Sequence, residues 1–420
     1  MSSDTQVFAT FVLIPPQQHA LQVTLTGTGG GRVTSDPAGI DCGANCWLTF
    51  ADGSMVTLTA VAAAGSYFAG WAGACSGTTS CTLTMTSDEH VSARFDPSTD
   101  SRPRMYSITE VPGVEGVADL SPTSINQSGD VVGSYRLSLS RAHAFLYDAA
   151  SGTTQRIAAD STDVQGAAAI NSARDVAIST LISPPVQQRA YRWQAGVETN
   201  IGALPPGPNS PQSGANAINE SGWIAGWSLG SANWQRAVLW DGTALYDLGS
   251  LAGTWSMANA INSNGVVVGS TAVKDDVYPH AAAFDRGTIH DLGSLGPTGS
   301  TAYGINDSGR VVGASSVGAG PLLHAFVYDL PSGPMRDVSP NQPCTLIAVN
   351  GSGDAVGSCS PADRVNHAAL WHRDTMADLN DAISDPSWLL IIARAINDAG
   401  QITGTGTRNG EARAFILTPQ

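Results

Sequence analysis

The chain has 420 residues, of which only 13% are charged, while 46 are glycine and 23 are proline. This length exceeds one ordinary core, so several domains or a repeat array are expected. The net charge of -15 and the 20 scattered Lys and Arg residues exclude a protein that binds nucleic acid through its phosphates. The abundance of glycine and other small residues favours short strands and turns over long helices.

The N-terminus carries no targeting signal. No apolar run is long enough to span a membrane, so no membrane insertion is expected, and the first residues lack the basic start and apolar stretch of a signal peptide. Residues 1–11 (MSSDTQVFATF) nevertheless match residues 85–95 (MTSDEHVSARF) at six of eleven positions. We interpret residues 1–19 as the remnant strand of a truncated upstream repeat that packs poorly, and expect the signal peptide to be missing from this fragment.

Residues 20–97 have the pattern of a small β module. Alternating runs rich in Val, Thr and Leu are separated by Gly and Asp-Gly turns, which predicts roughly six strands. The six cysteines of the chain form three close pairs: Cys42 with Cys46, Cys75 with Cys81, and Cys344 with Cys359. Such pairs are typical of local disulfides in exported proteins. The alternative is a zinc site from the first four, but their spacing is not the usual zinc signature, and no metal or cofactor is expected.

The order of short motifs in this module is informative. GGGRVTSDPAG, VTLTA, GSYFAGW and VSARF occur in succession within about 75 residues. In this order they resemble the divergent internalin-type bacterial repeat. The resemblance implies a spacer or stalk on a secreted or surface bacterial protein.

A polar, proline-bearing linker at 98–104 precedes a different pattern. Seven copies of a motif such as AINSNGVVVGS follow, at steps of 43 to 48 residues. Their asparagines are Asn126, Asn171, Asn219, Asn262, Asn306, Asn350 and Asn397. The second copy departs from the pattern, with Arg174 and Ile178 where the others have Gly.

Each copy continues with a second motif such as HAFLYD and then a short strand ending in a DLG-like turn. Four strands at this period predict a propeller blade, because one such sheet buries its faces only when neighbours stack on it. The seventh copy lacks its last strand, while an orphan strand at 105–113 precedes the first copy. We therefore predict an all-β chain in which residues 105–420 form a seven-bladed β-propeller, closed by pairing of the N- and C-terminal strands.

The repeats also resemble a known family. HAFLYD, HAFVYD and the C-terminal run from DLNDAIS to RAFILTP are similar to the extracellular repeats of the HAF family, and the match covers residues 105–420. The resemblance implies a secreted or surface-exposed bacterial protein. It carries no established activity or catalytic residue.

Two repeated positions could be taken for metal sites. The IN-x-SG turn suggests a calcium loop, yet each turn supplies one carboxylate or none, so a structural hairpin turn is favoured. The second motif opens with either His or Arg, at His143, Arg189, Arg236, His280, His324, His367 and Arg413. Since arginine cannot replace a histidine ligand, we interpret this position as a hydrogen-bond donor at a strand end. The aromatic residue four positions later is predicted to lie in the core between blades.

Four tryptophans lie outside the repeated positions, at Trp223, Trp227, Trp234 and Trp255. Exposed aromatic clusters often mark binding surfaces, and indole faces stack well on sugar rings. These residues are therefore the candidate ligand site, and a core role between blades is the alternative. We expect Trp223→Ala and Trp227→Ala to leave the fold intact.

No catalytic motif stands out. A pair of loop carboxylates, drawn from Asp275, Asp276, Asp381 and Asp385, could act as a glycosidase pair over the channel. The favoured reading is a secreted or cell-surface, monomeric, non-enzymatic binding or adhesion protein, whose partner is an extracellular glycan or protein. A carbohydrate-active enzyme and a purely structural surface protein are the alternatives.

Overall fold

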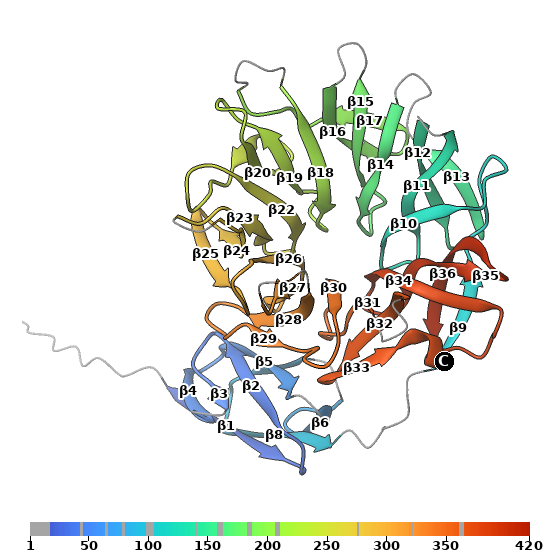
Figure 1. Cartoon of the computed structure of the whole chain (residues 1–420). Helices are drawn as coiled ribbons and strands as arrows, with labels where there is room; N and C mark the ends of the chain where they lie inside the picture. Colours follow the sequence, from blue (N-terminus) through green and yellow to red (C-terminus); the bar gives the residue numbers. More distant parts are fainter. Residues whose placement is uncertain are drawn as a thin grey trace, which may run out of the picture. The chain divides into compact units, whose positions relative to one another are not determined.

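The computed structural model describes residues 17–42, 45–63, 66–77, 80–97, 105–138, 141–157, 163–182, 187–205, 211–274, 277–318, 320, 322–360 and 365–420. The chain divides into two compact units, Met1–Arg102 and Pro103–Gln420. The described residues are all-β apart from one 3₁₀ turn, η1 (Leu379–Ala382) (Figure 1). No helix in this part of the chain has the length and apolar character needed to cross a membrane. The predicted linker and residues 1–16 of the predicted remnant strand lie outside the described residues.

The first unit contains eight strands in its described residues, two more than the sequence indicated. They are β1 (Gln18–Thr26), β2 (Gly31–Asp36), β3 (Asp41–Cys42), β4 (Trp47–Ala51), β5 (Met55–Ala62), β6 (Ser66–Gly73), β7 (Cys81–Thr84) and β8 (Glu89–Pro97). They form two four-stranded sheets, of order β4-β1-β8-β6 and β3-β2-β5-β7. Strand β1 begins two residues before the boundary predicted at residue 20, and its His19 is buried beside Asp52.

Both sheets of the first unit contribute to a single core. Leu21 from β1, Val33 from β2, Leu58 from β5 and Phe95 from β8 are fully or almost fully buried in it. Cys42 is bonded to Cys46 and Cys75 to Cys81, so the disulfide interpretation of these cysteines is confirmed. Such covalent links stabilise a domain whose core is this small.

The second unit repeats one design. Its described residues form seven four-stranded antiparallel sheets, six of which take consecutive strands. These six are β10 (Leu120–Ile125), β11 (Val131–Ser138), β12 (Arg141–Asp148), β13 (Thr153–Ile157); β14 (Asp163–Ile170), β15 (Val176–Ile182), β16 (Gln187–Gln194), β17 (Val197–Asn200); β18 (Ser213–Ile218), β19 (Ile224–Leu229), β20 (Gln235–Trp240), β21 (Leu245–Asp247); β22 (Ser256–Ile261), β23 (Val267–Thr271), β24 (His280–Asp285), β25 (Thr288–Gly293); β26 (Ser300–Ile305), β27 (Arg310–Ser316), β28 (Leu323–Asp329), β29 (Arg336–Asp337); and β30 (Cys344–Val349), β31 (Ala355–Cys359), β32 (His367–His372), β33 (Thr375–Asp378).

The seventh sheet joins the two ends of the unit. It consists of β34 (Trp388–Ile396), β35 (Ile402–Arg408), β36 (Glu411–Pro419) and β9 (Tyr106–Glu110), in that order. Strand β9 pairs antiparallel with β36, from Phe415 opposite Glu110 to Pro419 opposite Tyr106. The pairing that the sequence predicted for the terminal strands is therefore present.

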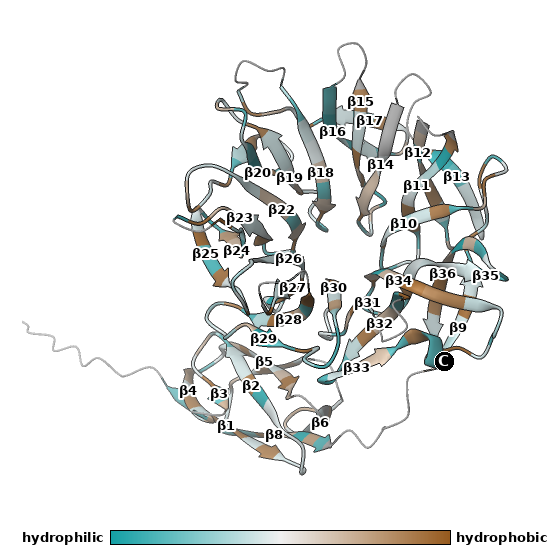
Figure 2. Cartoon of the chain, viewed as in Figure 1, coloured by the Kyte–Doolittle hydropathy of each residue, from teal (hydrophilic) through white to brown (hydrophobic). Residues whose placement is uncertain are grey.

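Cores lie between successive sheets. The repeated aromatic position of the second motif is buried or half-buried there, and Phe284, Trp371 and Trp240 each pack into an apolar cluster that spans two sheets. Hydrophobic and hydrophilic residues are mixed along the strands of every sheet (Figure 2). The prediction of an aromatic core position is confirmed, and the sheets are held by their neighbours as a propeller-like stack requires. Cys344 and Cys359, opposite each other on β30 and β31, form the third disulfide.

The second repeat forms its hairpin despite lacking both glycines. In the first repeat a Cβ at Gly133 would lie 2.1 Å from the carbonyl oxygen of Ser121, so only glycine fits opposite that carbonyl. In the second repeat Ile178 occupies the corresponding position and pairs with Ala167. The other departure, Arg174, adopts a positive φ of 63°.

Candidate functional site

The asparagine of the first motif directly follows the inner strand of each sheet, and these seven side chains form a continuous hydrogen-bonded ring. Each Nδ2 donates to the backbone carbonyl of the corresponding asparagine in the next sheet, at 2.9 to 3.2 Å. The relay runs from Asn126 through Asn171, Asn219, Asn262, Asn306 and Asn350 to Asn397, which donates back to Asn126. We call this set the asparagine ring.

The same side chains also close their own turns. Each Oδ1 accepts a hydrogen bond from the backbone N–H four residues later, as Asn306 does from Arg310 at 2.9 Å. All seven asparagines are buried. Without these hydrogen bonds, the buried polar atoms of the ring would be unpaired, which would lower the stability of the fold. The structural reading of the IN-x-SG motif is the one that these contacts support.

Three residues before each asparagine, the inner strand carries a β-bulge. The register with the second strand shifts at this residue in all seven sheets. The bulged residues are Thr123, Ala168, Asn216, Asn259, Tyr303, Ile347 and Arg394, and all seven line one cavity of about 360 Å³ between the inner strands. We call this residue the channel-facing position and this cavity the chamber; Figure 1 shows β10, β14, β18, β22, β26, β30 and β34 on the inner side of their sheets.

A second cavity, the mouth, lies at the asparagine turns and has a volume of about 410 Å³. Ile305, Val349 and Ile396, each directly before an asparagine, border both the mouth and the chamber. The mouth carries the carboxylates of Glu220, Asp307 and Asp398. Each of these accepts a backbone N–H from the preceding turn, from Ser172, Ser263 and Gly351 respectively, at 2.7 to 3.1 Å. The acidic rim therefore reinforces the ring.

Arg394 is the one charged side chain among the residues that line the chamber. It is exposed to solvent and makes no hydrogen bond or ion pair with any described residue. Partial burial nevertheless lowers the pKa of its guanidinium. The guanidinium is still charged, since arginine keeps its proton at physiological pH. The chamber thus holds an uncompensated cation in a strongly acidic protein.

Two amides face the same chamber. The Nδ2 of Asn216 donates to the carbonyl of Ala258 at 2.7 Å, and that of Asn259 donates to Ala302 at 2.9 Å. Their Oδ1 oxygens are left as acceptors. Tyr303 adds a half-buried phenol to the same lining. The chamber therefore offers one cation, two amide acceptors and one aromatic ring.

The four candidate tryptophans do not form one surface. Trp223 follows the asparagine turn of its sheet and packs against the apolar cluster around Phe284, with its ring over Gly265 of the next sheet. Trp227 lies further along β19, opposite Gly214 on β18, and its indole covers that glycine. Both side chains are half-buried. The expectation that removing Trp223 would leave the fold unaffected does not fit this packing.

The other two tryptophans lie toward the opposite end of the sheet. Trp234, 51% exposed, follows β19 in the loop to β20. Trp255 donates its indole N–H to Gln235 at 3.3 Å, which brings it next to that loop. Trp234 and Trp255 are thus near each other, while Trp223 is at the turn end of the strand. The binding role of this surface stays a prediction.

The His or Arg at the start of the second motif bonds to the acidic residue of the fourth strand. His280 pairs with Asp291, His324 with Asp337, His367 with Asp378, Arg236 with Asp247 and Arg413 with Glu110. The interpretation as a strand-end donor is confirmed at these five positions. Among the described residues no group of three or more His, Cys, Asp or Glu is arranged to hold a metal ion.

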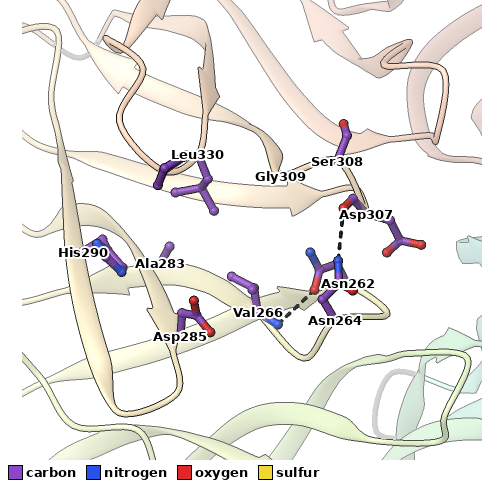
Figure 3. Close-up of a pocket in the computed structure, with 11 residues that line it drawn as sticks. Asn262, Asn264, Val266, Ala283, Asp285, His290, Asp307, Ser308, Gly309 and Leu330 are labelled. Carbon is purple, nitrogen blue, oxygen red and sulfur yellow. Dashed lines mark hydrogen bonds between the residues drawn. The ribbon is translucent and has the colours of Figure 1, made fainter. Parts of the chain in front are cut away.

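A smaller pocket of about 220 Å³ opens between two neighbouring sheets (Figure 3). Its lining combines apolar residues such as Val266 and Leu330 with Asp285 and His290. The amides on its other side already have partners, since Asn262 accepts from Val266 and Asn264 donates to Asp307. The pocket is a crevice between sheets whose polar groups mainly hold the turns together.

The structure describes two of the four carboxylates proposed as a glycosidase pair, Asp381 and Asp385. Asp275 and Asp276 lie outside the described residues. Asp381 is exposed on η1, and Asp385 accepts hydrogen bonds from the hydroxyl and backbone N–H of Ser387, which lower the pKa of its carboxyl. A lowered pKa suits a permanent carboxylate and opposes the role of general acid.

Sequence reasoning missed the channel-facing position. The signal was present: when the copies are aligned on their asparagines, this position reads Thr, Ala, Asn, Asn, Tyr, Ile and Arg, beside neighbours that barely change. When one position varies among otherwise similar repeats, it indicates where the scaffold presents different side chains.

Known proteins resemble the two units to different degrees. Residues 21–99 match the family model of the divergent InlB B-repeat domain, which supports the repeat module. No curated protein matches the chain.

Solved structures resemble the chain at low identity. An oligogalacturonate lyase in complex with manganese is 11% identical with a TM-score of 0.50, over 76% of this chain and 97% of that one. The β-propeller domain of the trilobed protease from Pyrococcus furiosus is 8% identical with a TM-score of 0.48, over 72% and 93%. A puromycin hydrolase is 10% identical with a TM-score of 0.48, and the match spans 70% of this chain and 53% of the hydrolase. At such identities the likeness concerns the fold alone.

Proposed function

We propose that residues 105–420 form a seven-bladed β-propeller of HAF-type repeats whose ring is closed by β9 and β36. The asparagine relay supports this reading, because it passes through seven sheets and returns to its start. The shared sheet of the terminal strands supports it as well, since such pairing fastens the first blade to the last.

The protein is a secreted or cell-surface binding protein without enzymatic activity. The module at 20–97 serves as its spacer, and the propeller, as a monomer, is the platform that binds an extracellular glycan or protein. The match to a bacterial repeat domain and the three disulfides favour an oxidising, extracytoplasmic compartment. One observation carries the binding role: the inner strands all lead into the same asparagine, yet they present six different residue types at the seven channel-facing positions.

The test is a screen of the purified chain on arrays of immobilised glycans and extracellular bacterial or host proteins. We expect selective capture by at least one class of ligand. The matched variant is Ala168→Trp. Its larger side chain should fill the chamber from a bulge and block binding there, without removing any hydrogen bond of the ring. Absence of all capture would instead favour a purely structural surface protein, and release of shortened sugar products would favour the carbohydrate-active enzyme.

A further inference from the structure

Among the residues that the structure describes, Arg394 makes no contact with the scaffold of the kind that other arginines of this unit make. Elsewhere in the second unit, arginines hold carboxylates of the scaffold: Arg310 bonds to Asp329 and Arg413 to Glu110. Arg394 has no such contact among the described residues, and its neighbours on the strand, Ala393 and Ala395, are buried in the cores beside it. The strand is thus fixed on both sides while the guanidinium is free for a ligand.

Partial burial affects the charge of this arginine. Reduced solvation disfavours the charged form of a basic group, as the lowered pKa of Arg394 reflects. An anion that pairs with the guanidinium would offset this cost, and a carboxylate can do so through two parallel N–H···O bonds. Pairing with such an anion would therefore stabilise the charged guanidinium.

The other polar groups narrow the class of anion. Since Asn216 and Asn259 use their N–H groups on backbone carbonyls, they present acceptors, which suit hydroxyl donors. The ring of Tyr303 can pack on an apolar ring face. The chamber volume of about 360 Å³ is at the lower end of the range of about 300–1,000 Å³ that is common for small-molecule sites.

We propose that the chamber binds a small hydroxylated carboxylate of sugar-acid type, with its carboxylate on Arg394 and its hydroxyls donating to Asn216 and Asn259. This inference rests on the proposed binding function and specifies its ligand. The sugar acid could be free or could be the terminal residue of an acidic glycan. Both forms carry the carboxylate and hydroxyls that the chamber would bind.

The experiment is a calorimetric titration of the full chain with D-glucuronate, D-glucose and inorganic phosphate at low ionic strength. Glucuronate should bind. Glucose, which lacks the carboxylate, should bind at least about 10-fold more weakly, because a hydrogen-bonded charge contributes more than a neutral group. Phosphate should bind less tightly than glucuronate, since it has no hydroxyl-bearing ring for the amides and Tyr303. Equal affinity for phosphate would overturn the sugar-acid assignment.

Variants locate the site. Arg394→Gln should lose at least about 10-fold in affinity for glucuronate, and Asn216→Ala should lose less, since it removes a neutral contact. The matched control is Arg286→Gln, which removes one positive charge from an exposed turn and should bind as the parent does. An oligosaccharide ending in glucuronate, tested in parallel, separates a free sugar acid from a glycan terminus.

The outcomes separate this inference from the proposed function. Failure of glucuronate to bind, or binding that Arg394→Gln leaves unchanged, overturns the inference. If the array screen still shows capture in that case, the binding function holds and the ligand lies elsewhere, as on the surface of Trp234 and Trp255. If the array shows no capture either, both proposals fail together.

Discussion

The asparagine ring and the channel-facing position lie three residues apart on the same seven strands, yet they follow opposite rules. The ring has one residue type at all seven places, and each side chain links two sheets and closes one turn. The channel-facing position has six residue types at seven places and contributes few bonds to the scaffold. Where a side chain satisfies buried backbone groups its identity is fixed, whereas a side chain that faces solvent in a cavity is free to vary.

The largest effect on stability is expected at the asparagine ring. Asn306→Ala removes a donor to the Asn350 carbonyl and an acceptor of the Arg310 N–H, both in a buried setting. We expect the free energy of unfolding to fall by about 3 kcal/mol, because two buried backbone groups lose their partners. Urea denaturation measures this. Asn264→Ala, at an exposed residue two positions after the ring asparagine Asn262, is the control and should cost no more than about 0.5 kcal/mol. A loss of the same small size for Asn306→Ala would contradict the structural role of the ring.

The tryptophans provide the next contrast. Trp223→Ala should lower the free energy of unfolding by about 2 kcal/mol, since its ring packs on the cluster around Phe284 and covers Gly265. Trp234→Ala should change it by less than about 0.5 kcal/mol, because that side chain is half exposed. Thermal unfolding of the two variants compares them directly. Equal effects would mean that Trp223 is not part of the core.

The second repeat differs from the others at the turn residue Arg174. Arg174 occupies a positive φ that glycine has in the other repeats, and its guanidinium holds Asp130, which is almost completely buried, at 2.8 Å. Arg174→Gly relieves the backbone but removes the partner of a buried carboxylate, so we expect a net loss of about 1–2 kcal/mol. Chemical denaturation at neutral pH measures the difference, and a gain in stability would contradict it.

The second ion pair of Arg174, with Asp148, predicts a pH dependence. Hydrogen bonding from Arg174 holds the pKa of Asp148 below its ordinary value. A carboxylate with a lowered pKa in the folded state stabilises at neutral pH, and this contribution is lost as the pH falls through that lowered pKa. The stability difference between the parent and Arg174→Gly should therefore shrink between about pH 7 and about pH 3. A difference that stays constant over this range would show that the pair contributes nothing.

The smallest effect on stability is expected at the chamber. Arg394→Gln removes a group that bonds to no described residue, so the free energy of unfolding should change by less than about 0.5 kcal/mol. Thermal unfolding without ligand checks this, and a large loss would assign Arg394 to the scaffold.

Much of the fold could be predicted from the sequence because the repeated positions have local causes. The spacing of the asparagines, the alternation along each strand and the orphan strand before the first copy were sufficient to predict four-stranded sheets and the pairing of β9 with β36. The chamber could not be predicted, since a bulge changes which side chains face inward and Arg394 reads as one charge in an apolar run. The packing of Trp223 could not be predicted for a related reason: the glycine that makes room for its ring belongs to the next repeat.

The most direct test of this account is a crystal structure of the full chain grown with glucuronate. We predict electron density for the sugar acid in the chamber, with its carboxylate within hydrogen-bond distance of the Arg394 guanidinium and the asparagine ring unchanged. An empty chamber, with the sugar acid bound over Trp234 or between two sheets, would contradict it.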